Sequence, residues 1–203
     1  MIAIVDYGLG NVLAFKNIYK RFGIEATVAK VPEDLLKASK IILPGVGSFD
    51  WAMTKLNNSG LRAVLDNLVL KKKLPVLGVC VGMQMMAKKS EEGVRPGLGW
   101  IDADVVKFDN KSCAETPVPH MGWNSVVPRH EKTLFCMVKE PKYYFLHSFF
   151  IRVRDENSVL STSCYNISFC SAINFGNVYG TQFHPEKSHQ WGEQLLKNFA
   201  EIC

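Results

Sequence analysis

Cys80 stands midway between two glycines in the stretch GVCVG, residues 78–82. Residues 76–79 predict a short buried strand, and residues 82–88 predict the start of a helix. The pattern G-x-C-x-G is typical of a nucleophile elbow, a strained strand-to-helix turn with room only for very small residues two positions from the nucleophile. Such a turn places the sulfur beside free N–H groups of a helix N-terminus, which favour a thiolate and stabilise an oxyanion. Cys80 is therefore a candidate nucleophile, although a buried structural cysteine also fits this stretch alone.

Among the five histidines, His184 is the best candidate for a general base, because it follows a strand predicted over residues 177–183. Pro185 favours an extended conformation at His184, and an extended i, i+2 pair points both side chains the same way. Glu186 is then expected to reach the imidazole, fix its tautomer and stabilise the imidazolium. His-Pro-Glu alone is more typical of a surface turn. Together with Cys80 it supplies a nucleophile, a base and an orienting carboxylate.

The elements that must position these residues alternate between strand and helix in the first half of the chain. Apolar runs predict strands over residues 2–5, 26–28 and 40–43. Amphipathic runs predict helices over residues 12–22, 32–38, 51–56 and 61–71. This order predicts a parallel sheet covered by helices on both faces.

The loop after the third predicted strand, PGVGS at residues 44–48, contains two glycines that allow a close backbone approach to a ligand. In a cysteine acyl-transfer enzyme, this loop is expected to supply a second N–H to the oxyanion. A plain tight turn is the alternative. An earlier glycine pair, Gly8 and Gly10, does not predict a dinucleotide site, because the third glycine of that fingerprint would fall at Leu13.

The second half of the chain changes character after a loop rich in glycine and proline at residues 91–99. Alternating runs predict strands over residues 101–108, 143–153, 158–164, 169–175 and 177–183, with a hairpin turn at Gly176-Asn177. A final helix is predicted over residues 188–203, with Ser188 as its N-cap. We therefore expect an α/β fold in one domain, residues 1–203, whose mostly parallel central sheet carries an antiparallel extension.

Composition excludes several other classes of function. The 203 residues are 47% hydrophobic and 21% charged, with a net charge of +5 and no aromatic–basic stripe for nucleic acid. The six cysteines form no CxxC pair and no zinc-like cluster, so we expect reduced thiols and no metal. No apolar run has the length of a membrane span, and the first residues lack the pattern of a signal peptide. We expect a cytoplasmic protein.

Seven motifs occur in order along the chain: DYGLGN at 6–11, PGVGSF at 44–49, GVCVGMQ at 78–84, SEEG at 90–93, PHMGWN at 119–124, YYFLHSF at 143–149 and FHPEKS at 183–188. With them the sequence resembles the class I, triad-type glutamine amidotransferases, whose fold is flavodoxin-like. Within that class it is most similar to the glutaminase subunits of imidazole glycerol phosphate synthase, an enzyme of histidine biosynthesis. The resemblance covers the chain nearly from end to end.

This resemblance implies a reaction for the three residues identified above. Cys80 would attack the carboxamide carbon of L-glutamine, His184 would shuttle the proton, and Glu186 would orient His184. Ammonia would leave first, and water would then hydrolyse the glutamyl thioester. No cofactor takes part.

The resemblance also implies two sets of binding residues. Those expected to hold glutamine, mostly through backbone groups, are Gly47, Gln84, Ser148 and Phe149. The family docks on a (β/α)8 barrel cyclase of the HisF type, because free ammonia would be protonated in water. The positions expected to contact that partner in a heterodimer are Asn11, Trp123, Tyr144 and Lys187.

Some positions differ from the residues that are usual in the family. Val81 stands where leucine is more common and Phe149 where tyrosine is common, while Trp100 and Asp102 replace a more apolar or small pair. None of them is a triad residue, so glutaminase chemistry is still expected. The differences leave open a paralogue that feeds ammonia to another synthase, such as a surface-polysaccharide sugar amidotransferase.

Two further hypotheses belong to other classes. The chain could be a non-enzymatic binding module on the same scaffold, in which case Cys80 would not react with a glutamine-like electrophile. It could also be a self-contained cysteine hydrolase that acts on peptides or γ-glutamyl groups, in which case the isolated chain would be fully active.

Overall fold

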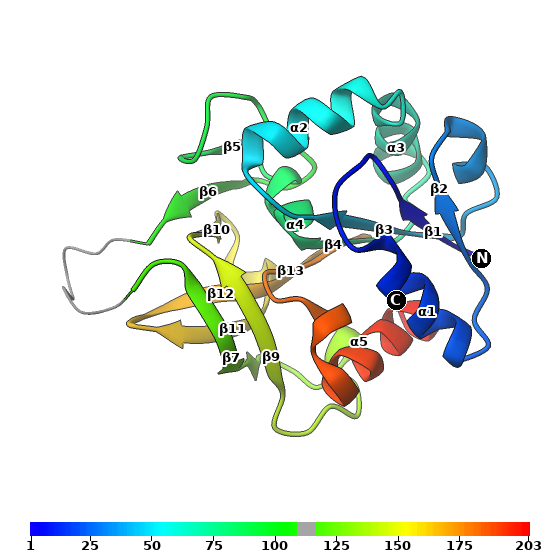
Figure 1. The fold of residues 1–203 in the computed structure, drawn as a ribbon. Helices are drawn as coiled ribbons and strands as arrows, with labels where there is room; N and C mark the ends of the chain where they lie inside the picture. Colours follow the sequence, from blue (N-terminus) through cyan, green and yellow to red (C-terminus); the bar gives the residue numbers. More distant parts are fainter. Residues whose placement is uncertain (109–116) are drawn as a thin grey trace.

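The computed structural model describes residues 1–108 and 117–203, and its centre is an eight-stranded sheet (Figure 1). The strand order is β2-β1-β3-β4-β13-β12-β11-β8. The parallel strands are β1 (Ile2–Val5), β2 (Ala26–Ala29), β3 (Lys40–Gly45), β4 (Val76–Cys80) and β13 (Val178–Thr181). The antiparallel strands are β12 (Ile167–Phe175), β11 (Val159–Tyr165) and β8 (Val127–Pro128). The expected parallel sheet with an antiparallel extension is confirmed.

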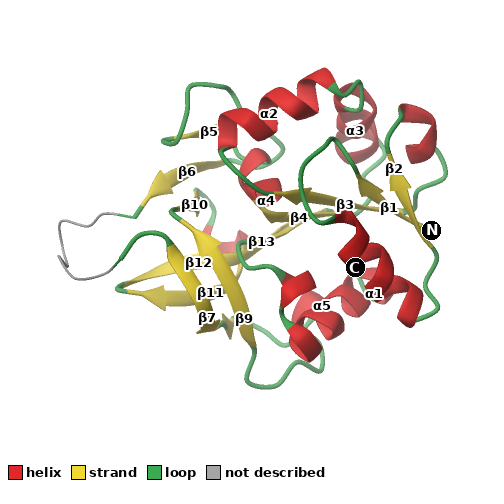
Figure 2. Cartoon of the chain, viewed as in Figure 1, coloured by secondary structure: helices red, strands yellow, loops and turns green. Residues whose placement is uncertain are grey.

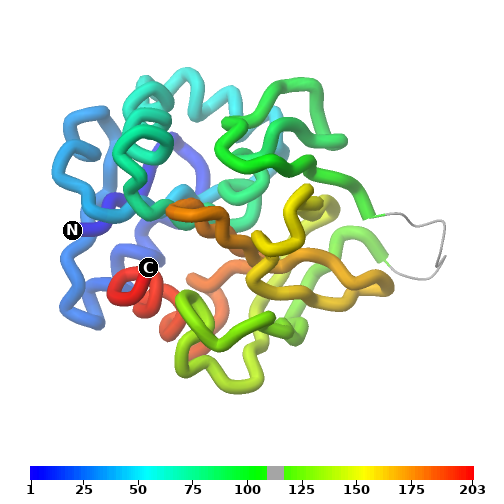
Figure 3. The backbone as a smooth tube through the Cα atoms, turned by 180° about the vertical axis from the view of Figure 1, so that it is seen from behind, coloured from blue at the N-terminus to red at the C-terminus, as the bar shows by residue number. Residues whose placement is uncertain are grey.

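Helices cover both faces of the parallel strands (Figure 2). On one face lie α2 (Phe49–Asn58), α3 (Arg62–Asp66) and α4 (Val81–Met85). On the other face lie α1 (Val12–Arg21) and α5 (His189–Glu201), so that the two ends of the chain lie on the same side of the molecule (Figure 3). A hydrogen bond of 3.2 Å from the Tyr19 hydroxyl to the Leu196 carbonyl joins α1 to α5. None of the described helices is long and apolar enough to cross a membrane.

Several predicted elements differ in detail from the structure. The helix expected at 32–38 is a short 3-10 helix, Pro32–Leu35, and the one expected at 61–71 continues beyond α3 as a π-helical turn, Asn67–Lys71. Ser188 does precede α5, but its hydroxyl forms no cap, because it donates to the His184 carbonyl at 2.6 Å and accepts from the Tyr144 amide at 3.0 Å.

Only some of the later strands form the antiparallel extension of the central sheet. Two small sheets stand apart from it: β10 (Phe149–Val153), β6 (Ala103–Lys107) and β5 (Lys89–Ser90) form one, and β7 (His120–Ser125) and β9 (Lys142–His147) form the other. The single strand predicted over 143–153 is divided at Ser148 into β9 and β10, which pair with different partners. Strand β7 was not predicted, because HMGWNS has few of the β-branched residues that mark strands.

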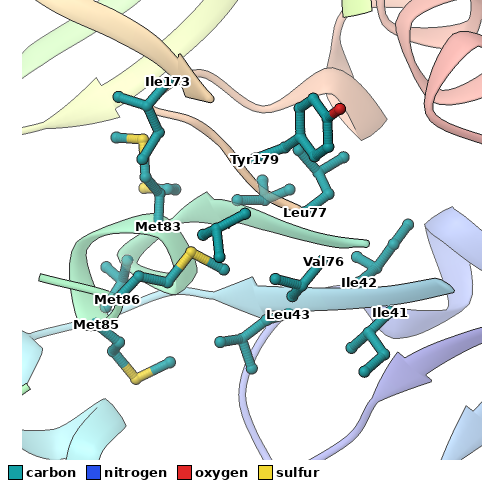
Figure 4. Packing of buried hydrophobic residues seen from close by; sticks show 14 of the residues in the cluster. Ile41, Ile42, Leu43, Val76, Leu77, Met83, Met85, Met86, Ile173 and Tyr179 are labelled. Carbon is teal, nitrogen blue, oxygen red and sulfur yellow. The ribbon is translucent and has the colours of Figure 1, made fainter. Parts of the chain in front are cut away.

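The core that supports the predicted elbow lies where α4 packs against the sheet (Figure 4). Ile41 and Leu43 from β3 lie beside Val76 from β4, and all three are fully buried. Met83 from α4 points toward Ile173 of the antiparallel part of the sheet. Strand β4 is buried along its whole length and pairs with β3 on one side and β13 on the other, so both neighbouring strands support the turn at its end.

Two glycines allow β3 to touch the start of α4. A Cβ atom at Gly82 would lie 2.0 Å from the Leu43 carbonyl oxygen, and one at Gly45 would lie 2.2 Å from the Gly82 nitrogen. These distances leave no room for any side chain. The glycine two residues after Cys80 is therefore a packing requirement of the turn, as the elbow pattern predicted.

We predict that Gly82→Ala lowers the free energy of unfolding by about 3 kcal/mol, because the added methyl group overpacks the contact with Leu43. Gly23 is the matched control, since its φ is +67° but a Cβ atom there would meet nothing within 4 Å. Gly23→Ala should cost about 1 kcal/mol from backbone strain alone. Urea unfolding of both variants measures the difference, and equal losses would contradict the close-approach argument.

Candidate active site

Cys80 occupies the sharp turn between β4 and α4. Its φ of +55° and ψ of −115° are rare for a residue with a side chain and are typical of a nucleophile elbow. The residue is only 3% exposed, and its sulfur lies 3.8 Å from the Leu146 carbonyl oxygen. The strained turn thus directs the sulfur toward β9 at the carboxyl end of the parallel strands.

His184 and Glu186 meet as the sequence predicted. Nδ1 of His184 lies 2.8 Å from Oε1 of Glu186, and both side chains are 3% exposed. The backbone is extended at His184 itself, but Pro185–Lys187 form a 3-10 helix, so Glu186 reaches the ring through a turn rather than along an extended strand. The His184 ring and the Cys80 sulfur line the same cavity, where the charge of one affects the pKa of the other. The structure therefore brings the three candidate residues together at one site.

The environment of His184 favours its charged form. Burial by itself lowers the pKa of His184, but the charge of a Cys80 thiolate and its hydrogen bond act in the opposite direction, and Glu186 adds to them. Together they raise the pKa of His184 from its ordinary 6.5 to about 10. At neutral pH the arrangement therefore holds His184 as an imidazolium beside Cys80 and Glu186.

A cavity of about 300 Å³ opens beside the sulfur. Cys80 and His184 line it together with all four residues predicted to hold glutamine: Gly47, Gln84, Ser148 and Phe149. A cavity of this size suits a small ligand. Of the four residues that differ from the usual family pattern, Val81 and Phe149 line the cavity. The other two lie elsewhere: the Trp100 indole donates a hydrogen bond to Asp66, and Asp102 forms a salt bridge with Lys88.

Gln84 is fixed by two hydrogen bonds from its amide nitrogen. Nε2 donates to the Phe149 carbonyl at 3.0 Å and to Oε1 of Gln182 at 3.1 Å. Gln182 in turn directs its own Nε2 toward the Cys80 sulfur at 3.8 Å. Both amide hydrogens of Gln84 are therefore used inside the protein, and its Oε1 is the atom that can accept a hydrogen bond from a ligand.

Sequence reasoning missed two residues of the site. Gln182, which is fully buried, has no signal of its own beyond its place before Phe183 and His184. Glu92 lines the cavity and accepts a hydrogen bond of 2.7 Å from the Phe49 amide, so the motif SEEG had marked a site residue without a stated role. With Lys187 also in the lining, the cavity has both charges that an amino acid zwitterion requires.

The glycine loop of the candidate oxyanion hole is supported by the first motif of the chain. The Tyr7 hydroxyl donates to the Pro44 carbonyl at 2.7 Å, and a Cβ atom at Gly10 would lie 2.7 Å from the Pro44 Cβ. Gly47 has a φ of +88°, which favours glycine. The pair Gly8 and Gly10 therefore belongs to a structural loop that packs against residues 44–47.

Three of the four predicted partner positions adjoin one another. Trp123 is 47% exposed and lies opposite Tyr144 across β7 and β9, and the Lys187 ammonium lies 5.7 Å from the centre of the Tyr144 ring. Asn11 is exposed at the start of α1, where its side chain accepts a hydrogen bond from the Ala14 amide. Asn11 thus has a structural role as an N-cap.

Residues 3–203 match the sequence model of the class I glutamine amidotransferases, and the chain belongs to this family. Within it, the chain is similar to proteins named imidazole glycerol phosphate synthase subunit HisH. Those of Bdellovibrio bacteriovorus and Leptospira interrogans are 53% and 48% identical, with 100% of each chain covered. A Pseudomonas aeruginosa protein named imidazole glycerol phosphate synthase subunit HisH 2 is 46% identical, again over 100% of both chains.

Solved structures agree with the fold. A putative GMP synthase subunit from Thermoplasma acidophilum superposes with a TM-score of 0.73 at 22% identity, covering 100% of this chain and 92% of that one. A structure described as glutamine amidotransferase gives a TM-score of 0.75 at 21% identity, covering 98% and 97%. These likenesses show the α/β architecture expected for the family.

We predict that Cys80→Ala lowers the pKa of His184, because the thiolate that opposes the effect of burial is then absent. In the intact protein the folded pKa lies above the unfolded 6.5, so its contribution to stability is fully present below pH 6.5 and is lost as the pH rises through about 10. Nitrogen NMR titration of the His184 ring in both proteins measures the shift. Identical titrations would show that Cys80 does not carry the partner charge.

Proposed function

We propose that this chain is the glutaminase subunit of an imidazole glycerol phosphate synthase, which hydrolyses L-glutamine and delivers ammonia to a cyclase subunit for histidine biosynthesis. The observation that carries the proposal is that Cys80 and His184 line one cavity, with Glu186 hydrogen-bonded to His184 behind it. Full-length similarity to proteins named HisH supports the choice of synthase.

In the first half of the proposed reaction, the Cys80 thiolate forms a C–S bond to the carboxamide carbon of glutamine. The oxyanion that develops is stabilised by backbone N–H groups of Val81, at the start of α4, and of the Gly47 loop. His184 gives its proton to the departing nitrogen, the C–N bond breaks, and ammonia leaves behind a glutamyl thioester.

In the second half, neutral His184 takes a proton from water as the water oxygen attacks the thioester carbon. The C–S bond breaks, glutamate leaves, and the thiolate and imidazolium return together. Glu186 holds Nδ1 of His184 throughout, so Nε2 faces the reacting atoms in both steps. No cofactor or metal is needed for this cycle.

Glutamine recognition follows from the lining of the cavity. We assign glutamine binding to Gly47, Gln84, Ser148 and Phe149, and we add Glu92, whose carboxylate suits the substrate's α-ammonium group. Gln84 contributes only its Oε1 as an acceptor, because its amide hydrogens are already bonded to Phe149 and Gln182. The site therefore selects a small ligand that donates hydrogen bonds.

The ammonia must remain unprotonated until it reacts, so the glutaminase requires a docked synthase. We propose a heterodimer with a (β/α)8 barrel cyclase of the HisF type, in contact with Asn11, Trp123, Tyr144 and Lys187. An exposed tryptophan with an aromatic and a cationic neighbour has the composition of an interface hot spot. We further propose that residues 1–203 act as one domain in the cytoplasm, where the unpaired state of the five described cysteines would persist.

We predict that Cys80→Ala abolishes glutamine hydrolysis, with a loss of at least about 10⁴-fold, because the thioester cannot form.

A glutamine analogue with a reactive α-chloroketone should label Cys80 although this residue is 3% exposed. Cys164 is the control, because it is exposed on β11 and far more accessible to a non-specific reagent. Mass spectrometry that finds Cys164 labelled before Cys80, or an active Cys80→Ala protein, would refute the proposed chemistry.

We predict that glutaminase activity of the isolated chain is low and rises strongly when the barrel cyclase is added.

Trp123→Ala should weaken the complex about tenfold or more, as expected for a central aromatic contact. Phe175→Ala is the matched control, because Phe175 is 50% exposed and belongs to β12, outside the proposed interface. Calorimetry measures both affinities. Full activity without a partner would favour a self-contained hydrolase, and activation by a sugar-modifying synthase alone would favour the paralogue.

A further inference from the structure

Two buried histidines beside the cavity have no part in the proposed reaction. His120 on β7 and His147 on β9 lie directly opposite each other in the small two-stranded sheet. Figure 1 shows these two strands side by side. They are 3% and 6% exposed, and Nδ1 of His120 lies 2.9 Å from Nε2 of His147. Burying such a pair of rings is costly unless each ring nitrogen has a hydrogen-bond partner. The hydrogen-bond partners of the four ring nitrogens therefore indicate the role of the pair.

The partners determine the tautomer of both rings. Nδ1 of His147 lies 2.8 Å from the Phe149 carbonyl oxygen, which can only accept, so this nitrogen carries the hydrogen. In a neutral ring Nε2 of His147 then accepts, and Nδ1 of His120 must donate to it. Nε2 of His120 accepts in turn from the Asn124 amide nitrogen at 3.2 Å. Every hydrogen bond from Asn124 to Phe149 therefore points in the same direction.

The surroundings keep this pair neutral. Burial is the largest cause that lowers the pKa of His147 to about 3; the hydrogen bond to Phe149 acts against it, and the charges on His120 and His184 act with it. Burial also lowers the pKa of His120 to about 4. The pair can therefore lie close to a charged His184 without competing with it for a proton.

The chain of hydrogen bonds ends on the substrate cavity. The Phe149 carbonyl accepts from His147 and also from Nε2 of Gln84, at 2.8 Å and 3.0 Å. Gln84 continues the series to Gln182, whose Nε2 faces the Cys80 sulfur. The segment held at this point, Leu146 to Phe149, lines the cavity where β9 ends and β10 begins.

We propose that His147 is a positioning residue for glutamine hydrolysis, which holds the Phe149 carbonyl and through it Gln84, while His120 and Asn124 select the Nδ1–H tautomer that His147 needs. The inference rests on the proposed function, because it assigns to these residues the placement of the substrate and not a chemical step. Loss of this placement raises KM more than it lowers kcat.

Two substitutions at position 147 separate positioning from packing. Phenylalanine suits the aromatic surroundings, since the ring centres of Phe108 and Phe169 both lie 5.3 Å from that of His147, but it has no hydrogen to donate. Asparagine is smaller, yet its Nδ2 can occupy the place of Nδ1 and donate to the Phe149 carbonyl. His147→Phe therefore keeps the aromatic packing and loses the hydrogen bond, whereas His147→Asn keeps the hydrogen bond and loses the packing.

We expect His147→Phe to raise KM for glutamine about tenfold with a smaller change in kcat, the size of effect that one buried hydrogen bond produces. His147→Asn should stay within about threefold of the original KM. Both are measured in the complex with the barrel cyclase, with urea unfolding as the record of stability. If His147→Phe keeps the original KM, or if His147→Asn is the worse variant, the positioning role is overturned.

A second measurement does not depend on activity or on variants. Nitrogen-15 NMR of the histidine rings should show His120 and His147 as neutral Nδ1–H tautomers from pH 5 to 8, with exposed His130 as the internal reference. A hydrogen on Nε2 of His147 would overturn the inference even if the protein is a glutaminase. Absence of glutaminase activity in the unaltered complex would instead refute the proposed function.

Discussion

The arrangement of the site depends first on the contact between β3 and the turn that joins β4 to α4. Gly45 and Gly82 let the two backbones meet without side chains between them. Cys80 is thereby held with a positive φ at the end of a fully buried central strand. Because the constraint acts on the backbone, the direction of the sulfur does not depend on the flexible contacts of its own side chain. The same contact fixes the candidate oxyanion loop relative to the sulfur.

The charges of the site are tolerable only as a set. Isolated charges with 3% exposure would cost several kcal/mol each, but here the His184 ring lies between the Cys80 sulfur and the Glu186 carboxylate. Each charge offsets part of the desolvation cost of its neighbour. This explains why the pKa of His184 rises although burial alone would lower it. The neutral rings of His120 and His147 supply hydrogen bonds near these charges without adding a charge of their own.

The small sheets explain how the second half of the chain serves the site. Strands β7 and β9 form a separate two-stranded sheet, which carries the exposed Trp123 and the half-buried Tyr144 and also buries His120 and His147. One pair of strands therefore carries both the proposed docking residues and one wall of the cavity. A partner that contacts the exposed side of this pair touches an element whose other residues lie beside the substrate.

Local patterns were sufficient for the alternating strands and helices of the first half, the Gly176-Asn177 hairpin, and the turn at Cys80, because periodicity and glycine spacing are properties of neighbouring residues. The contact between His184 and Glu186 could also be predicted, since the two residues are only two positions apart. Local patterns did not reveal the division of the later strands at Ser148, the separate sheet of β7 and β9, or the roles of Gln182 and Glu92. Those features arise from contacts between residues tens of positions apart, and only the packed tertiary structure decides which of the possible distant partners meet.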